Sequence, residues 1–259
     1  MKFTLKALSL ALVASASTVT FADEAPLLPL GLEFSGSAAM TTDYRFRGLT
    51  QTKSDPAIQV GFQLDHSTGL YAGVWGSNVD FGVTLNEDDG SFEADSPHLE
   101  LDPYIGYAKT FENLPGAPTL DVGVWYHACP GKSDLNFVEY YASVGFDGLV
   151  AEGDSVSTYV YYTDDNLGGG DDAWYLNASY SVPFGAGFGG VAAVGFNDVK
   201  NGSDHVWDWK VGATYEFQSI SGFSAELAAV GTDTETKGES SAYKRGVETG
   251  AVFTLTKSF

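Results

Sequence analysis

Apolar and polar side chains alternate with a period of two along most of the chain from Leu32 onward. Between residues 58 and 65, for example, the apolar side chains share one parity: Ile58, Val60, Phe62 and Leu64. Successive side chains of a strand point to opposite faces, so this alternation predicts strands with one apolar and one polar face. It predicts about twelve of them, at 32–48, 58–65, 70–81, 99–107, 120–127, 138–146, 154–163, 174–182, 188–197, 207–217, 223–231 and 249–259. No helical periodicity of useful length accompanies them, so the chain is predicted to be all-β.

Strand length and the placement of aromatic residues favour a membrane barrel among the all-β folds. The predicted strands run to about ten residues, the length that a tilted strand needs to cross a bilayer. Aromatic residues of the apolar parity lie near strand ends, where interface girdles would sit: Tyr44 and Phe46, Trp207 and Trp209, Tyr215 and Phe217. We therefore expect a single antiparallel up-and-down transmembrane β-barrel of about twelve strands. A soluble periplasmic barrel or sandwich, with the apolar parity as a dry core, is the alternative.

The first 22 residues have the features of a secretory signal peptide. Lys2 and Lys6 form a short basic start, residues 7–13 are largely apolar, and segment 20–22 has a small-x-small end. The apolar stretch is short of a full membrane span, which argues against an N-terminal membrane anchor. We expect residues 1–22 to be the signal peptide and residues 23–259 to form the barrel domain.

The last predicted strand ends on an aromatic residue. Phe259 shares the parity of Ala251, Phe253 and Leu255. A terminal aromatic on such a strand resembles the sorting signal of outer-membrane barrels, so Phe259 is interpreted as a terminal sorting aromatic. Lys257 departs from that pattern, although a lysine stem can follow apolar surface while its ammonium group reaches the interface.

The connections support the same topology, because outer-membrane barrels have long outer loops and short periplasmic turns. With both termini periplasmic, the outward connections are 52–56, 82–97, 128–136, 164–172, 198–203 and 232–246. Two of them are dense in acid: Glu87, Asp88, Asp89, Glu93 and Asp95 in one, and Asp164, Asp165, Asp171 and Asp172 in the other. Such loops can bind Ca²⁺ or Mg²⁺, which prefer carboxylate oxygens, yet no complete calcium-loop motif is present. Solvated surface acid, or divalent bridges to lipopolysaccharide, is the alternative.

The composition is acidic and rich in aromatic residues. The 259 residues include 34 acidic and 13 basic side chains, for a net charge of −21, and 14% are aromatic. Nucleic acid is a poor partner for such a chain, because its phosphates need lysine and arginine. The apolar content excludes a disordered acidic chain, and the mean hydropathy of −0.06 excludes a bundle of membrane-spanning helices. Cys129 is the single cysteine, so a free thiol is expected.

Charged residues of the polar parity define a candidate lumen charge cluster. They are Asp43, Arg45, Arg47, Glu100, Asp102, Asp121 and Glu139. In a membrane barrel this parity points inward. Opposed arginines and carboxylates can create a transverse field at a constriction and filter small solutes. Alternatively, the same groups pair as salt bridges that fill a narrow lumen, because unpaired buried charge is unfavourable. Twelve strands fall between the filled interior of about eight and the channel of about sixteen, so both interpretations stay open.

Motifs for catalysis or metal binding are weak. The histidines are scattered and lack the spacing of a zinc site: His66, His98, His127 and His205. Ser96, His98 and Glu100 share one parity, but alternate residues of a strand lie about 7 Å apart, too far for proton transfer. No Gly-x-Ser-x-Gly elbow frames a nucleophile, and the acidic neighbours of the glycines at 168–170 would repel phosphate. We therefore expect no enzyme activity, no cofactor and no metal site.

Three segments carry a resemblance to a known family. They are Thr42-Asp43-Tyr44-Arg45-Phe46-Arg47-Gly48, followed by Gln51 and Pro56-Ala57-Ile58-Gln59; GLYAGVWGSNVDF at 69–81; and ELDPYIGY at 100–107. Over residues 36–145 above all, the chain resembles the TorF family of porin-like proteins. That family has a Pro-Gly after an aromatic strand, as Pro130–Gly131 do here, with His127-Ala128-Cys129 replacing the usual aromatic lead-in. The resemblance implies an outer-membrane β-barrel of Gram-negative bacteria, and it brings no agreed substrate and no catalytic residues.

These observations predict a porin-like channel in the cell outer membrane. It would pass small hydrophilic solutes by diffusion, with a bias toward cations from its acidic rims and loops. Its expected surroundings are outer-membrane lipid, small solutes and divalent cations at the acidic loops. The alternative is a plugged structural barrel whose acidic outer loops bind divalent ions, lipopolysaccharide or a partner.

Overall fold

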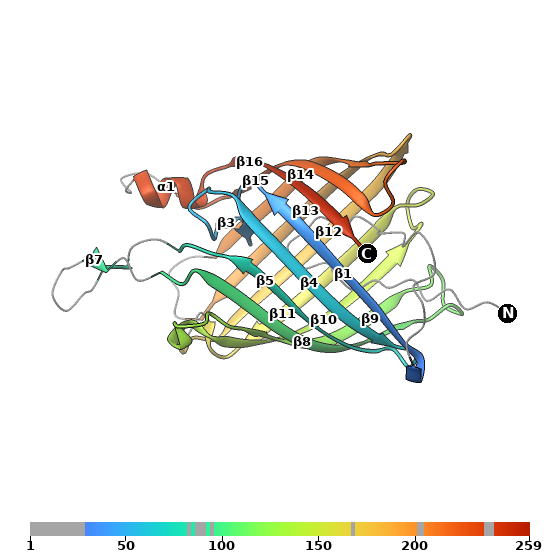
Figure 1. Cartoon of the computed structure of the whole chain (residues 1–259), viewed down its shortest axis with the longest axis horizontal. Helices are drawn as coiled ribbons and strands as arrows, with labels where there is room; N and C mark the ends of the chain where they lie inside the picture. Colours follow the sequence, from blue (N-terminus) through green and yellow to red (C-terminus); the bar gives the residue numbers. More distant parts are fainter. Residues whose placement is uncertain are drawn as a thin grey trace.

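The chain folds into a closed barrel of twelve antiparallel strands, as a computed structural model shows (Figure 1). The structure describes residues 29–81, 84–85, 92–93, 96–166, 169–200, 205–235 and 241–259. The signal peptide predicted at 1–22 and most of the acidic side chains predicted in loop 82–97 therefore lie outside the described residues. The predicted fold class, an all-β antiparallel barrel of about twelve strands, is confirmed.

The wall strands follow the period-two pattern closely. They are β1 (Leu32–Thr41), β4 (Ala57–His66), β5 (Leu70–Asn78), β8 (Leu99–Thr110), β9 (Thr119–His127), β10 (Phe137–Asp147), β11 (Ser155–Thr163), β12 (Ala173–Gly185), β13 (Phe188–Val199), β14 (Val206–Glu216), β15 (Phe223–Thr232) and β16 (Gly250–Ser258). The smaller elements are β2 (Arg45–Phe46), β3 (Leu49–Thr50), β6 (Thr84–Leu85), β7 (Phe92–Glu93), helix α1 (Ser241–Val247) and the 3-10 turns Pro29–Gly31 and Ser133–Leu135. The first strand was predicted to run to residue 48 but ends at Thr41.

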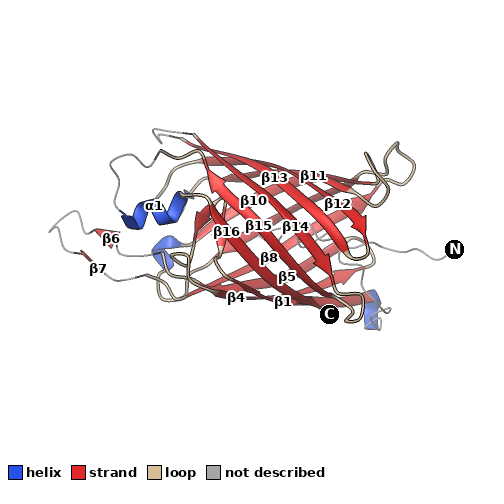
Figure 2. Cartoon of the chain, turned by 90° about the horizontal axis from the view of Figure 1, so that it is seen from above, coloured by secondary structure: helices blue, strands red, loops and turns tan. Residues whose placement is uncertain are grey.

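The barrel closes where the first and last strands pair. β1 pairs with β16 in the register Ser37↔Ser258 to Thr41↔Thr254, and on its other side with β4. Each wall strand therefore has two neighbours, which satisfies the backbone hydrogen bonds around the ring. Figure 2 shows the strands crossing the barrel axis obliquely, as ring closure requires.

Exposure of the side chains separates an apolar outer face from a polar inner face. On β4, Ile58 is 61% exposed whereas its neighbour Gln59 is 7% exposed. Because the outside of the ring is open and its inside is enclosed, the exposed parity points outward. Large apolar side chains exposed on this outer face include Phe34, Met40, Phe62, Ile105, Val122, Val211 and Leu227. No helix among the described residues is long and apolar enough to span a membrane.

Aromatic rings fill much of one side of the interior. The buried rings that form this cluster are Tyr44, Tyr71, Trp75, Tyr104, Trp125, Tyr141, Tyr159, Tyr161 and Tyr175. Trp125 interrupts the polar parity of its strand, and its ring stacks on Tyr104 with centroids 4.2 Å apart. Tyr71 lies over its cross-strand partner Gly106, where an added Cβ would meet the tyrosine ring at 2.3 Å. Glycine opposite tyrosine thus lets a large ring lie flat against the wall.

The two ends of the barrel differ. The long connections, including the segments with β3, β7 and α1, gather at one end, and the C-terminus lies toward the other (Figure 1). The connections β4–β5, β8–β9, β10–β11, β12–β13 and β14–β15 lie at the second end. The longest connections all belong to the first end, as predicted, although β13–β14 at that end is short.

Candidate functional site

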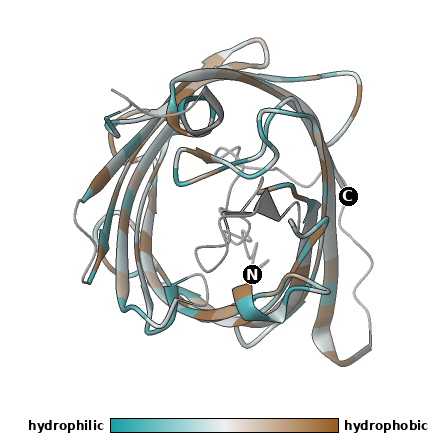
Figure 3. Cartoon of the chain, turned by 90° about the vertical axis from the view of Figure 1, so that its left-hand side faces the viewer, coloured by the Kyte–Doolittle hydropathy of each residue, from teal (hydrophilic) through white to brown (hydrophobic). Residues whose placement is uncertain are grey.

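Residues 42–56, here called the inward hairpin, leave the wall and fold into the barrel. Pairing of β1 with β4 stops at Thr41↔Ala57, and β2 then pairs with β3 across a two-residue turn of Arg47 and Gly48. Both turn residues have positive φ, 51° and 80°, the backbone that a tight hairpin of this kind needs. Figure 3, viewed along the barrel, shows chain folded inside the ring.

This geometry corrects the placement predicted for the first strand. Asp43, Arg45 and Arg47 were expected on the polar face of a wall strand, and they lie instead in the inward hairpin. Tyr44 was expected in an outer girdle, but it is 2% exposed and its ring packs edge-on to Trp75 at 5.3 Å. The alternation continued past Thr41 in the sequence because a second, inward-facing hairpin uses the same period as the wall.

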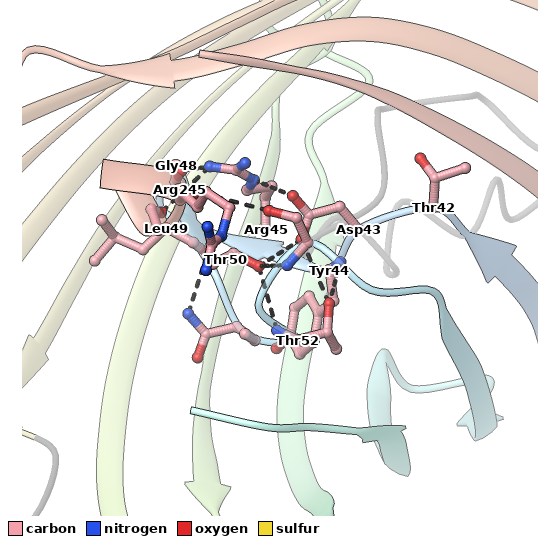
Figure 4. A network of polar contacts seen from close by, with 12 residues as sticks. Thr42, Asp43, Tyr44, Arg45, Gly48, Leu49, Thr50, Thr52 and Arg245 are labelled. Carbon is pink, nitrogen blue, oxygen red and sulfur yellow. Dashed lines mark hydrogen bonds and ion pairs between the residues drawn. The ribbon is translucent and has the colours of Figure 1, made fainter. Parts of the chain in front are cut away.

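Asp43 and Arg45 anchor the base of the inward hairpin (Figure 4). Arg45 Nε lies 2.5 Å from Asp43 Oδ2, while Asp43 Oδ1 accepts a hydrogen bond from the Thr50 hydroxyl at 2.5 Å. Arg45 Nη1 also donates to the carbonyls of Gly48, Gly246 and Glu248 at 3.0–3.3 Å. The pair therefore connects the hairpin to the segment that precedes β16.

Arg47 lies at the tip of the inward hairpin, and its side chain contacts the far wall. Its Nη2 lies 2.5 Å from Glu139 Oε1 on β10, with both side chains buried. Its guanidinium group also lies over Tyr175 at 4.2 Å and over Phe46 at 4.6 Å, distances typical of cation–π contacts. At the adjacent Gly48, an added Cβ would meet the Thr232 methyl at 2.5 Å, so the tip also approaches the opposite wall closely.

A line of ionisable groups continues from Glu139 across β9 to β8. His127 Nε2 lies 3.5 Å from Glu139 Oε2. Its other nitrogen, Nδ1, lies 3.0 Å from Asp102 Oδ2 and 3.9 Å from Glu100 Oε1. The imidazole stacks on Phe137 at 4.4 Å. This contact was not predicted, because the histidines are scattered along the sequence and spacing along the chain does not show which strands are neighbours.

Two groups outside the wall strands border this line. Burial, and then the carboxylates of Glu100 and Asp102, raise the pKa of the Tyr44 phenol well above its usual value. Burial and the same two carboxylates raise the pKa of the Cys129 thiol to about 12. The free thiol at Cys129 is buried.

Asp121 lies apart from the arginines. It accepts hydrogen bonds from the hydroxyls of Tyr71 at 2.6 Å and Tyr141 at 3.3 Å. The structure therefore divides the seven predicted charges into three groups. Asp43 pairs with Arg45. Arg47, Glu139, Glu100 and Asp102 lie around His127, and Asp121 lies with its tyrosines.

A cavity of about 160 Å³ lies between the inward hairpin and the wall that runs from β11 through β16 to β1 and β4. Its charged lining includes Lys210 and Glu226, whose Nζ and Oε1 are 3.5 Å apart. Asp208, also in the lining, accepts a hydrogen bond from the Tyr175 hydroxyl at 3.2 Å. Among the described residues Asp208 forms no ion pair. None of these three charges was singled out from the sequence, although Asp208 and Lys210 share the polar parity of β14.

Phe259 lies at the outer face of the closing strands. Its backbone exchanges hydrogen bonds with Gly36 at 2.9 and 3.0 Å. Its ring lies 6.5 Å from Phe34 and 6.2 Å from Phe62. Lys257 Nζ donates to the carbonyl of Ser221 at 2.7 Å, so its ammonium group lies at the β14–β15 turn.

A family model described as "Bacterial protein of unknown function (Gcw_chp)" matches residues 29–259, which include every wall strand. The chain belongs to this family. The Gcw_chp description names no activity, and no curated protein matches the chain.

Solved structures place the Gcw_chp chain among barrels of porin fold. The KdgM porin is 9% identical, with a TM-score of 0.53 over 87% of this chain and 99% of that one. The NanC porin is 8% identical, with a TM-score of 0.51 over 86% of this chain and 97% of that one. A KdgM porin in complex with disordered oligogalacturonate is 9% identical, with a TM-score of 0.52 over 87% of this chain and 98% of that one. At these identities the likeness concerns the fold.

Proposed function

We propose that the protein is an outer-membrane channel for passive diffusion of small hydrophilic solutes. The observation that carries the proposal is a closed ring of strands with an apolar outer face and a cavity with a partly polar, charged lining inside it. Such a ring is one of the two ways in which a chain can cross lipid with its backbone hydrogen bonds satisfied. The likeness of the fold to the KdgM and NanC porins supports the same proposal.

The solute path in this proposal lies to one side of the barrel axis. The side of the interior near β5 and β8–β10 is occupied by aromatic rings and by the pairs around His127, whereas the cavity lies along the wall from β11 through β16 to β1 and β4. Of the charges in the cavity lining, Arg45 pairs with Asp43, Arg47 with Glu139 and Lys210 with Glu226, whereas the Asp208 carboxylate forms no ion pair among the described residues. An unpaired carboxylate in a narrow pore attracts cations, as does a net charge of −21.

Planar-bilayer recording with the purified, refolded barrel tests this proposal. We expect stepwise conductance with a reversal potential that shows cation preference in a KCl gradient. Asp208→Asn should reduce the cation preference. Arg47→Ser should increase both the cation preference and the conductance. Each variant also shows that the current comes from this barrel and not from a contaminating porin. Absence of conductance steps, or an anion preference, contradicts the proposal.

A plugged barrel is the second candidate, favoured by the inward hairpin that Arg47 and Glu139 hold across the interior. In that case the acidic outer loops would do the binding, to divalent ions, lipopolysaccharide or a partner. Deleting residues 45–50 distinguishes the candidates. If the wild-type barrel shows no conductance and the variant without residues 45–50 does conduct, the barrel is plugged.

The remaining sequence predictions belong to the same proposal. We infer cleavage after Ala22, export to the outer membrane of a Gram-negative bacterium, and a sorting role for Phe259. The TorF resemblance and the absence of enzyme activity are likewise inferred. In the described part of the second acidic loop, Asp172 pairs with Lys200 at 3.0 Å and Asp165 accepts the Gly170 N–H at 2.7 Å. Divalent ions at that loop thus compete with internal partners.

A further inference from the structure

The charges around His127 are unbalanced. Arg47 neutralises Glu139, which leaves two further carboxylates, Glu100 and Asp102, facing a single imidazole. These groups are buried, with Glu100 9%, Asp102 2% and His127 5% exposed. Even a fully protonated imidazole neutralises only one of the two. Buried negative charge is unfavourable, so one more positive charge, from a proton or a metal ion, would stabilise this place.

Three neighbouring strands bring these side chains to one point. Glu100 and Asp102 are two residues apart on β8, so both point inward. His127 ends β9, where Leu101 bridges to Ala128, and Glu139 lies two residues beyond the cross-strand partner of His127 on β10. The wall strands are rigid elements, so the donor atoms are held in place before any ion arrives.

The donor atoms have the spacing of metal ligands. One nitrogen or oxygen atom from each of Glu100, Asp102 and His127 lies within 4.8 Å of the other two. The distances from His127 Nδ1 are 3.0 Å to Asp102 and 3.9 Å to Glu100. Ligands of a tetrahedral zinc ion at about 2.0–2.1 Å lie about 3.3 Å from one another. The observed separations bracket that value, so an ion can be seated by small movements of the side chains.

One buried oxygen at the same point has no partner in the described part of the chain. Among the described residues, Glu100 Oε2 makes no hydrogen bond, although the Tyr44 hydroxyl lies near this carboxylate, whereas His127 Nε2 and Glu139 Oε2 face each other at 3.5 Å. Buried polar atoms normally find partners, and those that do not require an explanation such as an ion. A histidine that binds a metal through one nitrogen commonly presents the other to a carboxylate, which is the position of Glu139.

We propose that Glu100, Asp102 and His127 bind a divalent transition-metal ion of the Zn²⁺ class. An imidazole ligand favours this class over Ca²⁺ and Mg²⁺, which take oxygen ligands. Glu139 is a positioning residue, because it holds the imidazole from its far side while Arg47 holds Glu139. The ion joins β8 to β9 and, through Glu139 and Arg47, fixes the inward hairpin. This site does not depend on whether the barrel conducts.

Metal titration of the folded barrel tests the proposal. The refolded protein is stripped with EDTA and titrated with ZnCl₂ in competition with a chromophoric chelator. We expect one tight equivalent in the wild type. His127→Gln should abolish tight binding, and Glu139→Gln should weaken it by about 10–100-fold, as is usual for a carboxylate that orients a ligand. His205→Gln is the matched control, because His205 also contacts a carboxylate, Asp198 at 3.0 Å, but at the exposed surface. It should leave binding unchanged.

Two further measurements guard against variants that fail to fold. Each variant is run unheated on a gel, where only a folded barrel migrates faster, and Glu100→Gln and Asp102→Asn replace His127→Gln if that variant is unfolded. Co²⁺ in place of Zn²⁺ should give visible d–d absorption in the wild type that is lost in these variants. The proposal is overturned if the wild type binds no Zn²⁺, or if loss of His127 or of both carboxylates leaves Zn²⁺ binding intact. It is also overturned if His205→Gln removes Zn²⁺ binding, or if Ca²⁺ displaces Zn²⁺ at equal concentration.

Discussion

Replacing Arg47 with methionine tests whether the inward hairpin is held by its buried charge. Methionine keeps an unbranched apolar stem between Phe46 and Tyr175 but removes the guanidinium group that lies 2.5 Å from Glu139. Glu139 is 1% exposed, so its carboxylate cannot turn to solvent, and among the described residues His127 is its one remaining ion-pair partner. The hairpin tip therefore loses its attachment to β10.

The magnitude follows from the burial of both partners. Removing one member of a buried ion pair costs about 3–5 kcal/mol, because the other charge stays buried. The two cation–π contacts add about 0.5–2 kcal/mol, although contributions from one cluster do not add fully. We expect Arg47→Met to lower the free energy of unfolding by about 3–5 kcal/mol. The double variant Arg47→Met/Glu139→Gln should lose less than half of this, because it does not leave the Glu139 charge without Arg47.

The assay is urea unfolding of the barrel refolded into lipid vesicles without added metal, followed by tryptophan fluorescence. Lys53→Met is the matched control, since the Lys53–Asp80 pair is also short, at 2.7 Å, but has side chains 44% and 43% exposed. Exposed pairs contribute about 0–1 kcal/mol, so this variant should unfold close to the wild type. If Arg47→Met is no more destabilising than Lys53→Met, or if the double variant is as unstable as the single one, buried charge does not hold the hairpin.

Three further predictions concern residues outside the wall strands. Burial opposes ionisation of Asp154, but hydrogen bonds that its carboxylate accepts from backbone N–H groups and from the Tyr180 hydroxyl hold its pKa below the usual value. Asp154→Asn should therefore destabilise the barrel at pH 7, and the difference in unfolding free energy from the wild type should shrink below about pH 4. A difference that stays constant down to pH 2 would contradict this. Gly48→Ala should cost about 1–3 kcal/mol in the same unfolding assay, because it adds a clash at 2.5 Å to the positive φ of 80°, whereas Gly131→Ala, with φ 87° and open space around it, should show only the smaller backbone effect. Cys129, with its pKa raised to about 12 by burial and the neighbouring carboxylates, should resist maleimide at pH 7.5 until the barrel is unfolded; equal labelling of folded and unfolded protein would show that the thiol is accessible.

The period-two pattern of the sequence was sufficient to predict the wall strands, apart from the end of β1, together with their two faces and the barrel. Alternation is a local property of extended backbone, so Ile58 and Gln59 reveal opposite faces of β4 without knowledge of any partner strand. The same reasoning placed Glu100, Asp102, Asp121 and Glu139 on the inner face, where the structure has them buried.

Which of these inner groups meet depends on how the strands pair in three dimensions. His127 lies 25 residues from Asp102 along the chain, and their contact at 3.0 Å depends on the register between β8 and β9. The departure of the chain from the wall after Thr41 was equally hidden, because a hairpin inside the barrel and a strand in its wall share one period. Parity identifies the face on which a side chain lies, whereas ring closure and register determine its neighbours, and those depend on interactions between residues distant in the sequence.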